Sequence, residues 1–326
     1  MQRNIVIWII SLVLVAVVSV AGTTLFIGDA PKKKLVISTT TSLYDTELLD
    51  TIEDQFETKY PKIDLYFISV GTGLAMTHAQ RGDADMILVH APSKELTFME
   101  GGYGTCRKIV AYNFFAIVGP ETDPANIKDL PPIQALSNIV NAGRDEEAKW
   151  ISRGDDSGTH TKEKQLWTIA GFNWTLLREE DWYEEASTGM GKTLQVADNL
   201  DAYTLADMGT YLKYHKDEII TLKTLVTQGE ELLNVYSAIA GNPTKHSHIN
   251  FDDAITFIEF LISEEGQEII ANFGKNLYDQ SLFYPAVNLL EQNTDPTIVQ
   301  WIRNYAFFDG YECPPEYWDN HPELYT

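Results

Sequence analysis

The strongest constraint on the fold is a repeated order of a short β-prone run, a small polar loop and a helical pattern. Three apolar runs are expected to form strands: Leu35–Ser38, Ile63–Val70 and Met86–Val89. Between them, residues 49–60 and 72–81 carry apolar side chains at helical spacing, and Pro61 stops the first of these helices. Strands that alternate with helices predict an α/β protein with a parallel sheet.

The rest of the chain predicts a second α/β block and a return to the first. Lys108–Val118 is a long β-prone segment that we expect to leave the first domain. Leu222–Val226 and Leu232–Ala240 are expected to carry the chain back, and Phe251–Phe273 has the pattern of one long amphipathic helix. The Trp- and Tyr-rich tail after Leu289 is too short for a domain of its own and is expected to wrap an existing one. A chain of 326 residues accommodates two such units.

Composition and charge argue against two broad classes of protein. Hydrophobic residues make up 44% of the chain and charged residues 22%, which is ordinary for a globular protein and not for a disordered one. Acidic residues outnumber basic ones 47 to 24, so the formal net charge is −23. Such a surface repels phosphate backbones, so we expect no nucleic-acid partner. The acidic net charge is still compatible with a small anion bound in a local pocket.

The first thirty residues form a separate segment. Ile5–Ile27 carries no charge and is long enough to cross a bilayer as a helix. Arg3 precedes it, and Ser19-Val20-Ala21 has the small-x-small pattern of a cleavage site. Residues 1–30 are therefore interpreted as a signal peptide or a membrane anchor; both are open, and the length of the apolar run favours the anchor. Either one places the body from Leu35 onward outside the cytoplasm, membrane-anchored or secreted/periplasmic.

The chain has two cysteines, Cys106 and Cys313, without the spacing of metal ligands. Outside the cytoplasm a disulfide between them is chemically permitted. Whether the two residues meet in space is not readable from the sequence, so a disulfide and two free thiols are both open.

Four loops share one chemical character, because each joins a β-prone run to a helical pattern and is built from Ser, Thr and Gly. They are Thr39–Ser42, Ser69–Gly73, Arg153–Thr159 and Ser187–Gly191. Helix N-termini offer free N–H groups and favour negative charge, and hydroxyls add further donors. Two such loops from each of two domains, facing one another, predict a cage for a tetrahedral oxyanion. The alternative for each loop is an ordinary helix cap; Ser42 and Asp45 also fit a capping box.

The third loop carries the sharpest signal. Arg153 offers a planar fork of donors that suits an oxyanion, and Ser157-Gly158-Thr159 supplies hydroxyls and N–H groups at the helix start. Asp155 is expected to pair with Arg153 and to hold its orientation. The alternative is a surface Arg–Asp pair in a turn, which contributes little to stability.

With these motifs in order, the sequence resembles the solute-binding proteins of tungstate ABC transporters. The segments that carry the resemblance are Ser38–Ser42, Ser69–Gly73, Asp85–Pro92, Ser152–His160 and Ser187–Gly191. The resemblance as a whole covers about Leu35 to Leu290. Two features depart from the family pattern: Cys106, and the tail after Leu289.

The resemblance implies an α/β, two-lobe periplasmic-binding-protein-like (type II) fold with a hinge of two crossing strands, preceded by the N-terminal hydrophobic helix. Lobe 1 is expected over residues 35–117 and 228–326, and lobe 2 over 118–227. The resemblance also implies that the chain is no enzyme and needs no cofactor or protein-bound metal. It further implies that the chain captures tungstate in the cleft and delivers it to an ABC permease with its ATPase. The expected ligand-binding residues are Thr40, Thr41, Ser42, Gly71, Thr72, Arg153, Ser157, Gly158, Thr159, Ser187 and Thr188.

Several other functions stay open at this point. Ser157, His160 and Asp155 or Asp156 contain the residue types of a hydrolytic triad, but Ser157 and His160 lie three apart on one helix start and no G-x-S-x-G elbow is present. Molybdate, sulfate or phosphate are alternative ligands. Phosphate keeps a proton near neutral pH and suits a free carboxylate; a carboxylate tied up by Arg153 favours the deprotonated anions. A membrane-tethered sensor domain is a weaker alternative.

Overall fold

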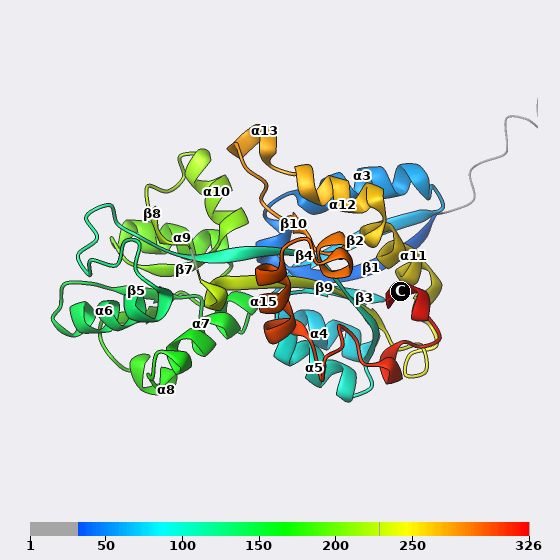
Figure 1. Ribbon diagram of the computed structural model, residues 1–326, viewed down its shortest axis with the longest axis horizontal. Coiled ribbons are helices and arrows are strands. Elements are labelled where there is room, and N and C mark those ends of the chain that lie inside the picture. Colours follow the sequence, from blue (N-terminus) through cyan, green and yellow to red (C-terminus); the bar gives the residue numbers. More distant parts are fainter. Residues whose placement is uncertain (1–31, 228, 326) are drawn as a thin grey trace, which may run out of the picture.

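The computed structural model describes residues 32–227 and 229–325, which form two α/β lobes arranged along the long axis of the molecule (Figure 1). The hydrophobic segment Ile5–Ile27 lies outside the described residues. Within the described ranges, no helix has the length and apolar character needed to cross a membrane.

Lobe 1 is built on one mixed sheet. Its strands follow the spatial order β10 (Tyr284–Pro285), β4 (Gly104–Gly119), β9 (Leu233–Gly241), β3 (Met86–Val89), β1 (Lys33–Thr40) and β2 (Ile63–Val70). β1 pairs in parallel with both β2 and β3, which confirms the predicted parallel α/β unit. β9 pairs antiparallel with β3 and β4, so the returning strand lies in the middle of the sheet.

Helices cover the lobe 1 sheet as the alternating pattern predicts. They are α2 (Thr41–Tyr44), α3 (Leu48–Lys59), α4 (Thr72–Arg81), α5 (Pro92–Glu100), α11 (Phe251–Ile262), α12 (Glu264–Asn272) and α13 (Lys275–Tyr278). Buried Leu35 and Ile37 of β1 belong to the same core as Phe56 of α3 and Phe257 of α11. The inward faces of strands and helices far apart in sequence thus close one core.

The prediction of one helix over Phe251–Phe273 is wrong, because Ser263 divides it. Ser263 has extended backbone angles, φ −63° and ψ 161°, and its Oγ accepts a hydrogen bond from Gly266 N at 3.2 Å. A serine that caps a new helix competes with continuation of the old one. The apolar periodicity runs through the break, which is why the pattern conceals it.

Lobe 2 has a smaller sheet around the far end of β4. Antiparallel strands β7 (Thr204–Asp207) and β8 (Lys223–Val226) both pair with β4, and β5 (Trp150–Ser152) pairs in parallel with β6 (Tyr183–Glu185). The helices of this lobe are α6 (Pro132–Arg144), α7 (Gly158–Ile169), α8 (Trp174–Leu177), α9 (Met190–Asn199) and α10 (Met208–Lys216). Trp150 and Trp167 are fully buried in its core.

Two segments of the chain connect the lobes. β4 pairs with β9 as far as Phe114 and with β7 from Phe115 onward, so one continuous strand belongs to both sheets (Figure 1). After β8, the chain returns through the 3-10 turn η1 (Glu230–Leu232) into β9. The lobes therefore meet at two neighbouring backbone crossings, and the structure has the two-lobe fold that the sequence predicts.

The C-terminal tail packs against lobe 1, as expected. It consists of α14 (Val287–Gln292), α15 (Pro296–Ala306), η2 (Pro315–Tyr317) and η3 (Pro322–Tyr325). Val299 and Ile302 of α15 share a core with Val235 of β9. Farther along, the Glu312 carboxylate accepts a hydrogen bond from Ile109 N, and the Tyr325 hydroxyl donates to a β4 carbonyl. The tail thus covers part of the β4 edge.

Cys106 and Cys313 are both buried, and both are free thiols in the structure. The Cys106 Sγ lies 3.2 Å from the carbonyl oxygen of Trp318 in the tail, and burial raises the pKa of the Cys106 thiol to about 12. Of the two states that the sequence leaves open, the structure therefore has the unpaired one.

Candidate functional site

The four Ser-, Thr- and Gly-rich loops come together between the lobes, and each begins a helix. Thr40 ends β1 and caps α2, Gly71 caps α4, Ser157 caps α7 and Gly189 caps α9. Two of these helix starts belong to lobe 1 and two to lobe 2. The predicted arrangement of four N-termini around one place is therefore present in the fold.

Contacts between the loops show how closely the lobes approach. The Nη2 atom of Arg153 in lobe 2 donates to the Oγ1 atom of Thr41 in lobe 1 at 3.1 Å. A Cβ atom added to Gly71 would lie 3.2 Å from the carbonyl oxygen of Asp155, and one added to Gly158 would lie 2.4 Å from Nε2 of His90. The first, second and third loops are therefore in direct contact.

Arg153 is buried at this junction, with 1% of its surface exposed. Its Nη2 atom binds Thr41 and forms an ion pair with the Asp155 carboxylate, as predicted. Its Nε and Nη1 atoms are buried without a hydrogen-bond partner among the described residues. A buried guanidinium with open donors is costly unless an acceptor completes it, so this side of the fork is available to an anion.

Two hydroxyls of the same loops share this condition. Thr72 Oγ1 in lobe 1 and Thr159 Oγ1 in lobe 2 are buried and have no partner within the described part of the chain. Each follows directly on a loop glycine, at the start of α4 and of α7. Together with Arg153 they make a set of unused donors, which an oxyanion with several acceptor oxygens would satisfy.

The two acidic residues of the third loop have different surroundings. Asp155 pairs with Arg153, and its second oxygen accepts a hydrogen bond from Ser157 N at 3.2 Å. The Asp156 side chain is 63% exposed and pairs with Lys94 across the lobes at 2.6 Å. Burial raises the pKa of Asp45, the C-cap residue of α2, against the attraction of Arg153. Sequence reasoning had not placed Asp45 near the site.

The residues of the alternative hydrolytic triad do not form one. Ser157 Oγ accepts a hydrogen bond from His160 N at 3.1 Å, so it acts as the helix cap. His160 Nδ1 accepts from the backbone N–H of Asp156 and therefore has no lone pair for a serine hydroxyl. The geometry lacks the nucleophile–base hydrogen bond that the hydrolase alternative requires.

The remaining predicted residues divide into buried and exposed ones. Thr40 and Ser42 are fully buried, and their hydroxyl oxygens lie 3.3 Å apart. Ser187 is exposed with a left-handed φ of 50°, and Thr188 is half-buried. The fourth loop touches the first through Gly189, whose added Cβ would lie 3.6 Å from Thr41. The structure therefore brings Ser187 and Thr188 only to the rim.

His90 is a site neighbour that is absent from the expected ligand-binding residues, although it belongs to the segment Asp85–Pro92 that carries the resemblance. It follows β3 directly, is 1% exposed and lies against Gly158. Behind it are Asn113, Asp207 and Asn234, three buried polar residues of strands β4, β7 and β9 with apolar residues on both sides in the sequence. Polar residues in such strands were the signal available in the sequence.

The histidines predict a pH dependence of stability. Burial lowers the pKa of His90 and of His160 to about 4, from an ordinary value of 6.5. As pH falls below 6.5, the unfolded chain binds protons that the folded chain refuses. The free energy of unfolding of the ligand-free protein is therefore expected to fall between pH 6.5 and 4, by up to about 1.4 kcal/mol per pH unit for each histidine.

Chemical denaturation at a series of pH values, with wild type and His90→Gln, measures this effect. Above pH 6.5, the free energies of unfolding of variant and wild type should differ by a constant amount. As pH falls from 6.5 to 4, wild type should lose more stability than His90→Gln. A difference that is the same at pH 7 and at pH 4.5 would contradict the assignment to His90.

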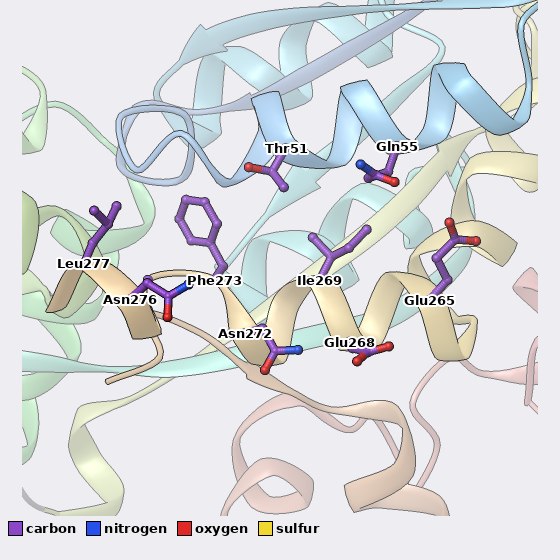
Figure 2. A pocket seen from close by; sticks show the side chains of 10 residues that line it. Thr51, Gln55, Glu265, Glu268, Ile269, Asn272, Phe273, Asn276 and Leu277 are labelled. Atoms are coloured by element: carbon purple, nitrogen blue, oxygen red, sulfur yellow. The ribbon is translucent and has the colours of Figure 1, made fainter. Parts of the chain in front are cut away.

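Another groove lies on lobe 1, between α3 and α12 (Figure 2), with a volume of about 470 Å³. Glu265 and Glu268 line it together with polar and apolar side chains, and no cationic side chain does. Glu265 pairs with Lys59 beside the groove at 2.7 Å, which leaves an anion no cationic side chain in the lining, so the groove does not compete with the loop site. Nowhere in residues 32–227 and 229–325 do three or more His, Cys, Asp or Glu side chains gather as a metal site.

Comparison with known proteins places the chain in a family. A model of the PBP superfamily domain matches residues 27–265. The chain is 42% identical over 270 residues to a putative ABC transporter anion-binding protein of Haloferax volcanii, covering 82% of this chain and 75% of the relative. It is 40% identical over 254 residues to the tungstate-binding protein TupA of Peptoclostridium acidaminophilum, covering 78% of this chain and 86% of the relative.

A solved structure agrees with these relatives. The crystal structure of the tungstate ABC transporter from Geobacter sulfurreducens is 40% identical, covers 75% of this chain and all of its own chain, and superposes with a TM-score of 0.67. The fold and the sequence identity both match these relatives. This chain belongs to the tungstate-binding family of ABC transporter solute-binding proteins, within the PBP superfamily.

Proposed function

We propose that this protein captures tungstate between its lobes, as the free oxyanion, and delivers it to an ABC permease with its ATPase. The observation that carries the proposal is the set of buried, unpartnered donors on Thr72, Arg153 and Thr159. All of them belong to loops that begin helices, and they come from both lobes. An oxyanion between the lobes would complete all of them at once, which supports binding without catalysis, cofactor or protein-bound metal.

The proposed donor cage is the set expected from the sequence. It comprises Thr40, Thr41, Ser42, Gly71, Thr72, Arg153, Ser157, Gly158, Thr159, Ser187 and Thr188. The buried members form its centre, and Ser187 and Thr188 would join from the rim. Six or seven hydrogen bonds to a charged ligand, at about 1.5–3 kcal/mol each, reach the scale of about 12 kcal/mol that nanomolar binding requires, before association costs.

The nature of the anion follows from the carboxylate of Asp155. Each of its oxygens already accepts one hydrogen bond, from Arg153 or from Ser157 N, so the carboxylate is tied up by Arg153 and is a weaker acceptor for a protonated anion such as phosphate. This favours fully deprotonated tetrahedral anions. Tungstate, molybdate and sulfate share charge and shape, and the choice of tungstate among them rests on the names of the relatives.

The proposal includes closure about the two crossing strands. Lobe 1 would comprise residues 35–117 and 228–326, and lobe 2 residues 118–227. Residues 1–30 would hold the protein outside the cytoplasm as an anchor, or direct its export as a signal peptide. Extracytoplasmic solute-binding proteins that deliver to a permease need one of these two arrangements.

A thermal-shift panel of four oxyanions tests the proposed function. Tungstate binds only the native state, so at about 1,000 times its dissociation constant it should stabilise the protein by about 4 kcal/mol and raise its melting temperature strongly. Molybdate should follow, and sulfate and phosphate should have little effect. Each salt is compared at equal ionic strength, because the net charge of −23 makes stability sensitive to screening. Stabilisation by phosphate alone would overturn the proposal in favour of a phosphate-binding protein.

A further inference from the structure

His90 lies in the site with one ring nitrogen toward lobe 1 and the other toward the cleft. Its ring stacks on Tyr236, with centroids 4.9 Å apart and planes 2° from parallel. Nδ1 lies 2.7 Å from the side-chain oxygen of Asn234. The amide nitrogen of Asn234 donates to Asn113 at 2.8 Å and to Asp207 at 3.1 Å, which fixes the oxygen as the acceptor for His90. Nδ1 of His90 therefore carries a hydrogen.

The other nitrogen, Nε2, is then a bare acceptor in a site made of donors. It lies 3.4 Å from Ser42 Oγ and faces Gly158 across the cleft. To bind it, the Ser42 hydroxyl must turn its hydrogen toward the ring, and Thr40 must donate to Ser42 at 3.3 Å. While His90 is neutral, the hydrogen bonds thus run from Thr40 to Ser42 and from Ser42 to His90. Both buried hydroxyls therefore point their hydrogens away from an anion.

Protonation of Nε2 would reverse the direction of the hydrogen bond between His90 and Ser42. Nε2–H would donate to Ser42 Oγ, which would free the hydroxyl hydrogens of Ser42 and Thr40 for an anion. It would also place a second positive charge beside Arg153. The same change removes a lone pair that repels a dianion.

The charges around His90 set the cost of that proton. Arg153 and Asp155 face it from the third loop, with opposite effects, and Asp207 faces it through Asn234. In the protein without an anion, complete burial lowers the pKa of the His90 imidazole to about 4, while Asp207 acts to raise that pKa. A dianion bound in contact with Arg153 and Ser42 would add two negative charges and favour the imidazolium.

We propose that His90 takes up one proton from solvent when the oxyanion binds, so that anion capture and imidazolium formation occur together. This inference rests on the proposed function and adds to it a linkage between proton and ligand. By that linkage, affinity should be highest in acid and fall as pH rises from about 5, by at most tenfold per pH unit, until the pKa of the complex is passed.

Calorimetric titration with sodium tungstate at about pH 6 and pH 8, where the anion stays monomeric, in buffers of different ionisation enthalpy, counts the protons bound. Wild type is expected to take up close to one proton per anion at the lower pH. His90→Gln keeps a side chain of similar size and should take up none, with an affinity that changes little with pH. His160→Gln is the matched control, because His160 is also buried near the third loop, and it should behave as wild type.

Each result has a definite meaning. Proton uptake that persists in His90→Gln, or that disappears in His160→Gln alone, would overturn the inference, as would tight binding to wild type without uptake. Absence of tungstate binding at every pH would overturn the proposed function and the inference with it. If His90→Gln does not fold, NMR of the seven histidine imidazoles in the wild-type chain provides the test. Exactly one imidazole should become protonated on tungstate addition at about pH 6, and none would contradict the inference.

Discussion

Replacement of Arg153 by alanine is expected to weaken tungstate binding by about 10²- to 10³-fold. The change removes a buried guanidinium whose Nε and Nη1 atoms have no other partner in the described structure. It also leaves Asp155 without its counter-ion, which adds a repelling carboxylate next to the anion. Truncating one member of a buried charge pair typically costs about 2–5 kcal/mol, and each 1.4 kcal/mol is tenfold in affinity. Calorimetric titration with tungstate measures the loss.

Two further variants separate charge, geometry and folding. Arg153→Lys keeps the positive charge but loses the planar fork, so it should bind with intermediate affinity. Arg144→Ala removes an arginine that is half exposed and pairs with Glu180 on the outside of lobe 2, and it should bind as wild type. All three should unfold cooperatively. Binding of tungstate to Arg153→Ala as tightly as to wild type would place the cage elsewhere and refute the site.

Gly158→Ala is expected to weaken tungstate binding by about 5- to 100-fold without destabilising either lobe. The added Cβ would lie 2.4 Å from Nε2 of His90, and that ring is held by Asn234 and Tyr236, so it cannot give way. The start of α7 must then withdraw and carry Arg153 with it. Overpacking of this kind costs about 1–3 kcal/mol. Because α7 begins at Gly158, alanine itself suits the helix.

Gly189→Ala is the matched control for this prediction. Gly189 also lies at a helix start in the cleft, yet its added Cβ would meet Thr41 only at the ordinary contact distances of 3.6–3.8 Å. This variant should bind within about threefold of wild type, a difference of well under 1 kcal/mol. Small-angle scattering of Gly158→Ala with tungstate should give a larger radius of gyration than wild type with tungstate. Equal affinity of the two alanine variants would show that the cleft does not close on His90.

The elements of lobe 1 that depend on local pattern could be predicted from the sequence. β2 and β3 have the predicted bounds, and α4 ends at Arg81 as expected. β1 extends through Thr40, because the hydroxyl residues after Ser38 continue its pairing with β2. The position of β9 between β3 and β4 is set by pairing across the whole chain, which no local pattern encodes.

The candidate site shows the same limit. The Arg153–Asp155 pair was predictable because the two residues are neighbours in one loop. His90 was missed because its role depends on Gly158, which is 68 positions away and approaches only when the lobes meet. Ser187 has the residue type expected of a donor, but the left-handed backbone that leaves it exposed depends on the turn in which it lies.

The central place of β9 in lobe 1 has a consequence for the order in which the chain can assemble. β4 to β8 lie between residues 104 and 226, so lobe 2 has all its strands once that stretch is synthesised. β3 and the first part of β4 lack a shared neighbour until residues 233–241 exist, and the tail that covers β4 comes later still. Nascent chains that end before residue 233 therefore expose unpaired edges of β3 and of the first part of β4, the surfaces that promote aggregation and recruit chaperones. The half of lobe 1 that is made first is the last part of the molecule to become complete.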